Sequence, residues 1–154
     1  MVPKTDVVLM GTNSMVTVAG GAVCESWVDT RGYDYGKFIY LTGVSTAAAG
    51  DTCDACELAH NDTLPTAFTT AGYAILDGCD GTAGDFTLPT ISSTHASAIV
   101  FNVDLRGKKR YIAMRVECDA THTGAAIALL TRKEEGEEAT TATTAQGVRT
   151  IVSV

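Results

Sequence analysis

This chain lacks the long apolar runs that mark membrane and secreted proteins. Its apolar segments, such as residues 7–10, are far shorter than the ~18 residues of a membrane-spanning helix. Residues 7–10 are also too short for the core of a secretory signal peptide. We therefore expect no membrane partner and a protein that is assembled in a cytoplasm.

Positive charge is also scarce. Eleven Lys and Arg residues face 18 Asp and Glu residues, which gives a net charge of −7. Because nucleic-acid binding needs a clustered positive surface, we expect no nucleic-acid partner. The one basic cluster is a single turn that contains Arg106, Lys108, Lys109 and Arg110. Its charges are either solvated or form a docking point for an acidic partner surface.

Aromatic residues make up only 6% of the chain, and Trp27 is the single tryptophan. A hydrophobic content of 45% and a mean hydropathy of +0.13 nevertheless argue against global disorder. At 154 residues the chain is long enough to form one domain with a core that needs no disulfides. We expect Trp27 to anchor either the core or a partner interface.

The five cysteines form no recognisable disulfide framework, because their number is odd and no secretory signal accompanies them. Reduced, buried thiols are the favoured interpretation. Cys53 and Cys56 have the CxxC spacing, but the sequence offers no second pair that would complete a zinc site. We predict no cofactor and no metal, with a metal or redox site at Cys53 and Cys56 as the alternative.

Catalytic motifs are absent as well. The three histidines lie in or beside predicted loops, and neither an HExxH nor a GxSxG motif occurs. Asp77, Asp80 and Asp85 alternate with glycines as in some calcium loops, but their spacing does not match an EF-hand. We therefore predict that the protein is not an enzyme.

Alternating apolar residues are what the chain does have. In residues 97–118, two rows share the two-residue period of a half-buried strand: Ile99, Phe101, Val103 and Leu105, then Ile112, Met114, Val116 and Cys118. Arg106-Gly107-Lys108 lies between them as a polar turn with a glycine suited to positive φ. The pattern predicts a β-hairpin whose apolar face needs a second sheet or more strands to cover it.

Further strands are predicted along the whole chain, at residues 7–10, 15–19, 22–30, 37–42, 52–60, 73–76 and 125–131. Residues 37–42 carry apolar side chains on both faces, so this strand is either buried on both sides or covered by a partner. We predict an all-β fold, an antiparallel β-sandwich of one domain.

Four regions follow from this pattern. Residues 1–21 form an N-terminal arm or edge strands, residues 22–131 form the sandwich, and residues 132–147 form an acidic, Thr-rich linker. Residues 148–154 are predicted to be a C-terminal β-strand or arm that pairs with its own sheet or with another subunit. Its expected partner-binding residues are Val148, Ile151 and Val152.

Three stretches, residues 27–34, 58–62 and 103–112, together resemble the head decoration, or capsid cement, proteins of tailed bacteriophages. The resemblance covers about residues 22–131. It implies a jelly-roll-like sandwich with extended terminal arms that binds the major capsid protein. It also implies a location on the capsid surface of the virion, stabilisation of the shell, and self-association into trimers or dimers. Trp27 and the basic turn are the expected contacts within the sandwich.

Two other functions remain open. One is a carbohydrate- or receptor-binding sandwich of a phage fibre or tail, which would expose aromatic residues such as Tyr33, Tyr35 and Tyr73. The other is a component of the head-tail connector, which the sequence does not distinguish from a shell protein.

Overall fold

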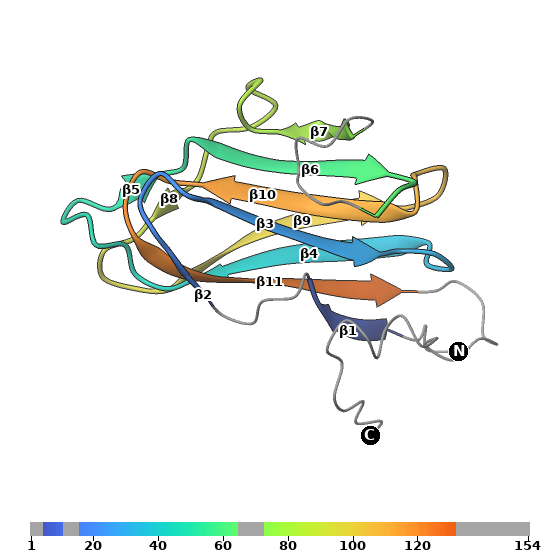
Figure 1. The fold of residues 1–154 in the computed structure, drawn as a ribbon, viewed down its shortest axis with the longest axis horizontal. Helices are drawn as coiled ribbons and strands as arrows, with labels where there is room; N and C mark the ends of the chain where they lie inside the picture. The colour runs from blue at the N-terminus through green and yellow to red at the C-terminus, as the bar shows by residue number, and fades with distance from the viewer. Residues whose placement is uncertain (1–4, 11–15, 65–72, 132–154) are drawn as a thin grey trace.

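The structure, a computed structural model, describes residues 5–10, 16–64 and 73–131, and all its strand pairs are antiparallel (Figure 1). Sheet A has the order β1-β11-β4-β9, and β2 also pairs with β11. Its strands are β1 (Thr5–Leu9), β2 (Val16–Val18), β4 (Tyr35–Thr42), β9 (Ser97–Asp104) and β11 (His122–Thr131). Residues 1–21, predicted as an arm or edge strands, include β1 at the edge of sheet A and β2, which also pairs in sheet A.

Sheet B covers the inner face of sheet A and has the order β3-β10-β6-β7. Its strands are β3 (Val23–Asp29), β6 (Ala55–Asn61), β7 (Ala74–Asp80) and β10 (Tyr111–Glu117). A small third sheet pairs β5 (Asp51–Thr52) with β8 (Thr90–Ile91) at one end of the molecule (Figure 1). The described residues include no helix that is long and apolar enough to cross a membrane.

The chain crosses repeatedly between the two large sheets. Apart from β5 and β8 of the third sheet, the strands β2, β3, β4 and β6 alternate between sheet A and sheet B. The strands β7, β9, β10 and β11 alternate again, beginning in sheet B. This order is that of a jelly roll, which is built from two interlocking Greek keys. The predicted all-β, antiparallel, jelly-roll-like sandwich is therefore confirmed.

The predicted hairpin at residues 97–118 is wrong. β9 pairs with β4 in sheet A, whereas β10 pairs with β3 and β6 in sheet B. Residues 105–110 therefore carry the chain from one sheet to the other, and Gly107 has the positive φ (75°) expected for the turn. Both apolar rows were correctly identified, but they face each other across the core instead of lying side by side in one sheet.

The core lies between the sheets and combines large and small side chains. Phe38 and Tyr40 of β4 are fully buried, and their neighbours in register on β11 are Ala128 and Ala126. The small alanines leave space beside the aromatic rings, which accounts for the high alanine content of β11. The opposite side of the core consists of buried side chains from sheet B: Val28, Cys56, Leu58, Ile112, Met114 and Val116.

Candidate functional site

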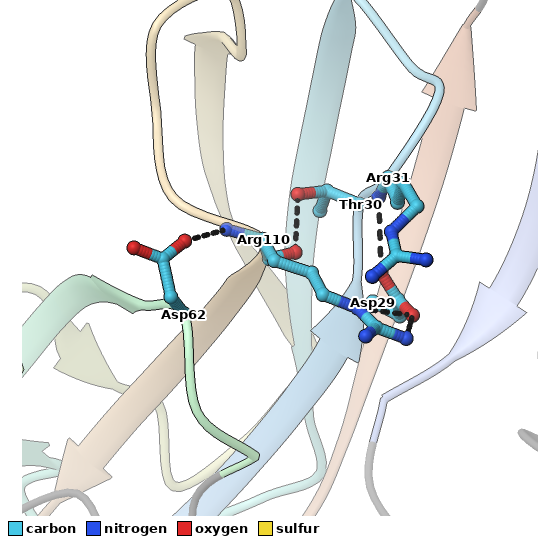
Figure 2. A network of polar contacts seen from close by, with 5 residues as sticks. All are labelled: Asp29, Thr30, Arg31, Asp62 and Arg110. Carbon is cyan, nitrogen blue, oxygen red and sulfur yellow. Dashed lines mark hydrogen bonds and ion pairs between the residues drawn. The ribbon is translucent and has the colours of Figure 1, made fainter.

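The three sequence stretches that carry the family resemblance meet at one end of the sandwich. Thr30, after β3, donates both its backbone N–H and its hydroxyl to the carbonyl oxygen of Arg110, each over 2.8 Å. The Arg110 guanidinium donates to the Asp29 carboxylate over 2.6 and 2.9 Å (Figure 2). Asp29 also accepts the backbone N–H of Arg31. The turn after β3 is therefore fastened to the start of β10.

The third stretch completes this loop junction, which we define by Asp29, Thr30, His60, Asp62 and Arg110. The backbone N–H of Arg110 donates to Asp62 over 3.2 Å (Figure 2). The backbone N–H of Lys109 donates to Nδ1 of His60, also over 3.2 Å. His60 Nδ1 therefore carries no proton here. Burial, and then the nearby charges of Lys109 and Lys108, lower the pKa of His60. Residues of the stretches 27–34, 58–62 and 103–112 thus hold three loops together.

The predicted basic cluster does not form one patch, because two of its members point to opposite faces of the molecule. Arg106 donates to Asp104 and lies over the ring of Tyr35, 5.1 Å from its centre, on the outer side of sheet A. Its hydrogen bonds lower the pKa of Asp104 to about 2. Arg110 lies over the ring of Tyr111, 4.7 Å from its centre, on the outer side of sheet B. Two of the four positive charges are therefore paired with carboxylates.

The other two members of the basic turn differ in exposure. Lys108 is exposed at the tip of the turn, and Lys109 is half-buried beside His60. Of the predicted cluster, Arg106 and Lys108 are thus the residues most open to a partner.

Trp27 lies on the outer face of sheet B and is half-buried. It packs against Ala59 and Ala113, which flank each other on β6 and β10, and Tyr73 joins this small cluster. The small alanine side chains leave room on the sheet surface for the indole ring to pack against them. Trp27 therefore anchors the outer face of sheet B and leaves part of its own surface exposed.

A row of charged residues, which the sequence did not reveal, crosses the same outer face. Arg115 of β10 pairs with Glu117 over 2.5 Å and with the buried Glu57 over 3.5 Å, and Glu25 lies beside Arg115 in register. Glu57 also accepts the hydroxyl of Thr82 over 2.8 Å. The outer face of sheet B is thus occupied by ion pairs and a packed tryptophan.

The outer face of sheet A is different, because aliphatic side chains fill the larger part of it and most of its polar residues lie toward the end near the basic turn. Its side chains come from four neighbouring strands and are in register, as in the row of Leu9, Ile127, Ile39 and Val100. We call this surface the apolar face, and its residues are Val7, Leu9, Ile39, Leu41, Val100, Ile127 and Leu129. Lys37 and Asn102 are the polar side chains in the row of Val7 and Leu129.

The apolar face is open to solvent. Val7, Val100 and Leu41 expose 54%, 46% and 42% of their surface. Four strands of about eight residues, spaced about 4.8 Å apart, give a face on the order of 500 Å². The largest apolar patch on a single soluble chain is typically about this size, and such a patch is often functional. Of the two alternatives predicted for residues 37–42, burial on both sides is wrong for the described residues, and cover by a partner stays a prediction.

A groove of about 560 Å³ adjoins the apolar face at the end near the basic turn. Its lining includes Tyr35, Lys37, Asn102, Asp104 and Leu129. The groove therefore joins the apolar side chains to the ion pair of Arg106 and Asp104, and gives the face a polar border.

The residues suggested for a metal, calcium or redox site make other contacts in the structure. Within residues 5–10, 16–64 and 73–131, no group of three or more His, Cys, Asp or Glu side chains is placed to hold a metal ion. Asp80 accepts the backbone N–H of Ala83, and Asp85 accepts that of Asp80, so these carboxylates stabilise a turn. Cys53 lies beside Cys118 rather than forming a site with Cys56.

The three tyrosines suggested for carbohydrate binding do not form one exposed platform. Tyr33 is buried and donates its hydroxyl to Asp6 over 2.6 Å. Tyr35 is exposed beneath Arg106, and Tyr73 packs in the Trp27 cluster on the other sheet. Val148, Ile151 and Val152, predicted to bind a partner through the C-terminal segment, lie outside the described residues.

Comparisons with known proteins identify no family for this chain. No family model and no curated protein matches the chain. Among solved structures, the chain is similar to the crystal structure of the Yersinia pseudotuberculosis-derived mitogen. The two share 12% sequence identity over 89% of this chain and 92% of the mitogen, with a TM-score of 0.39.

Proposed function

We propose that this chain is a bacteriophage virion structural protein that binds the outer capsid shell and stabilises it as a decoration, or cement, protein. The observation that carries the proposal is the exposed apolar face of sheet A on a rigid two-layer body. Fully burying an exposed Val, Leu or Ile side chain contributes about 1.5–3 kcal/mol, and these side chains, exposed by about half at most, each gain a corresponding part of it. Seven such side chains in register supply a surface whose burial favours association.

The occupant of the apolar face, in this proposal, is a second copy of the chain, which gives dimers or trimers. The face carries a single charged residue, Lys37, within its apolar rows, and so resembles the interior of an oligomer more than a surface that recognises a charged partner. Homo-oligomers with closed symmetry are the commonest assemblies of soluble proteins. Self-association also leaves the ends of the sandwich available for the shell.

The major capsid protein is the second proposed partner, at the capsid surface of the virion. The net charge of −7 favours contact with a basic region of the shell, and Arg106 and Lys108 offer the opposite sign at one corner. Trp27, half-exposed on sheet B, supplies the aromatic anchor that such interfaces often use.

The test is to mix the purified chain with empty phage capsids that lack it. We expect the chain to co-sediment with the capsids and to raise their resistance to heat and osmotic shock. A matched variant, Lys108→Glu with Arg106→Glu, should bind more weakly while keeping the β-rich circular dichroism spectrum of the original chain. If the folded original chain stays in the supernatant at every ratio tested, the proposed function is wrong.

A further inference from the structure

Two buried cysteines from distant parts of the sequence lie in direct contact. The sulfur atoms of Cys53 and Cys118 are 3.0 Å apart, and both side chains are almost fully buried. Cys53 lies in the turn between β5 and β6, and Cys118 follows the last residue of β10. The neighbouring backbone is joined as well, because the N–H of Asp54 donates to the carbonyl of Glu117 over 2.8 Å.

We propose that Cys53 and Cys118 are an oxidation site that forms an intrachain disulfide when the folded protein meets a small peroxide. A disulfide has an S–S bond of about 2.05 Å, so the two sulfurs need to approach by only about 1 Å. The hydrogen bond between Asp54 and Glu117 already holds the two backbones side by side. Side-chain rotation is therefore the main movement required.

The contact also prepares one of the sulfurs to react. The S–H of Cys118 donates to the sulfur of Cys53, which lowers the pKa of Cys53. The same contact, together with burial, raises the pKa of Cys118. Because the thiolate is the nucleophilic form of cysteine, Cys53 is the attacking group.

The reaction with hydrogen peroxide proceeds in two balanced steps. The Cys53 thiolate attacks one peroxide oxygen, an S–O bond forms, the O–O bond breaks, and the hydroxide that leaves takes up a proton as water. The sulfur of Cys118 then attacks the Cys53 sulfenic acid. The S–S bond forms, the S–O bond breaks, and the departing hydroxyl leaves as a second water with the Cys118 proton. Two thiols are oxidised and one peroxide is reduced to two waters.

The structure thereby assigns Cys53 a different partner from the one that the CxxC spacing suggests. Cys56 is buried in β6, and burial, followed by the charge of Cys53, raises its pKa to about 12. The pKa values of Cys24 and Cys79 are also raised, chiefly by burial. Cys53 is therefore the one cysteine among the five whose pKa is lowered.

The test is to treat the folded full-length chain with limiting hydrogen peroxide and analyse it by non-reducing peptide mapping. We expect a single cross-linked peptide pair that contains Cys53 and Cys118, with three of the five thiols still free. The bond closes a separation of 65 positions in the sequence. We therefore expect the midpoint of thermal unfolding to rise by about 5–15 °C and to return on reduction with dithiothreitol.

The variant Cys118→Ala should show no cross-link and no rise of the midpoint, whereas the control Cys24→Ser should behave like the original chain. The mapping of the original chain decides the question even if Cys118→Ala does not fold. A Cys53–Cys56 bond would overturn the assignment. So would a folded chain that keeps five free thiols under peroxide concentrations that oxidise the urea-unfolded chain.

Discussion

At the scale of single residues, the loop junction depends on hydrogen bonds that replace strand pairing. Beyond the end of β3, the backbone N–H and the hydroxyl of Thr30 both reach the carbonyl of Arg110, and the Thr30 side chain is buried. A buried hydroxyl that keeps its partner contributes about 0.5–1.5 kcal/mol to stability. A substitution that removes the Thr30 hydroxyl but keeps the side-chain volume should therefore give a measurable fall in the free energy of unfolding.

The variant Thr30→Val tests this bond. We expect the free energy of unfolding to fall by about 0.5–1.5 kcal/mol, because valine keeps the shape of threonine but cannot donate to Arg110. Urea unfolding followed by circular dichroism measures the change. Thr52→Val is the matched control, since the Thr52 hydroxyl makes its hydrogen bond to Thr90 on an exposed part of β5. Equal effects of the two substitutions would contradict the role given to Thr30.

His60 gives the junction a pH dependence. Its pKa is lower in the folded protein than the ordinary value of 6.5, so the unfolded chain binds the proton more readily. Stability is therefore at its full value above about pH 6.5 and falls as the pH drops toward the folded pKa. The main physical cause is that a charged imidazole is disfavoured by burial and by the nearby charges of Lys109 and Lys108, and protonation of Nδ1 also removes the acceptor of the Lys109 N–H.

The variant His60→Asn isolates this effect, because the asparagine oxygen replaces Nδ1 as acceptor and does not titrate in this range. Urea unfolding between pH 7.5 and pH 5 should show a smaller loss of stability in the variant than in the original chain. Identical pH profiles would show that the Lys109–His60 bond does not respond to protonation.

Sequence reasoning found some of the important residues and missed others for identifiable reasons. Gly107 was predicted because a turn with positive φ favours glycine locally. The contact of Cys53 with Cys118 was missed, because no local pattern relates cysteines that far apart. The burial of Glu57 was also missed, because its partners Arg115 and Thr82 come from distant parts of the sequence.

At the scale of strands, the alternation of apolar residues specified faces but not partners. β9 and β10 each have one buried row, as predicted, but a six-residue connection suits a hairpin and a crossing between sheets equally well. The crossing is favoured because each row fills the core from its own side, and β4 and β6 are already available as neighbours. Pairing is decided by the whole set of strands, which is why the local pattern predicted it wrongly.

The C-terminal segment supplies a prediction at the same scale. Residues 148–154 were predicted to form a strand that pairs with the sandwich or with a neighbouring subunit, and they lie outside the described residues. A chain shortened to residues 1–147 should keep the circular dichroism spectrum and thermal midpoint of the full chain, but associate and bind capsids more weakly. An insoluble truncated chain would instead identify the segment as a core strand of its own subunit.

At the scale of the whole molecule, the two outer faces of the sandwich have different chemistry. Sheet B carries the ion pairs of Arg115 and the packed ring of Trp27, whereas sheet A presents aliphatic side chains in register. An antiparallel sheet usually turns one polar face to water. The outer face of sheet A departs from this rule, and a second copy that covers it would restore the usual burial.

Two substitutions on the apolar face test this proposal. Val100→Lys and Leu41→Lys together place two charges among aliphatic neighbours that the proposed oligomer buries. Each side chain is a little under half exposed in the single chain, so the oligomer gains only about half of the ~1.5–3 kcal/mol of full burial from each. Losing both therefore weakens association by about 10-fold or more. Light scattering coupled to size-exclusion chromatography over a concentration series measures this change.

The matched control is Ile75→Lys, which changes a side chain of similar exposure, 40%, on β7 of the other sheet. This control should associate like the original chain, because the proposed oligomer leaves sheet B uncovered. If the original chain remains monomeric at the highest concentration, or if the Ile75 variant loses association as strongly as the double variant, the apolar face is not the self-association surface. Since Val100 and Leu41 are exposed in the single chain, both lysines can reach water there, and a loss of association then reports on the interface rather than on folding.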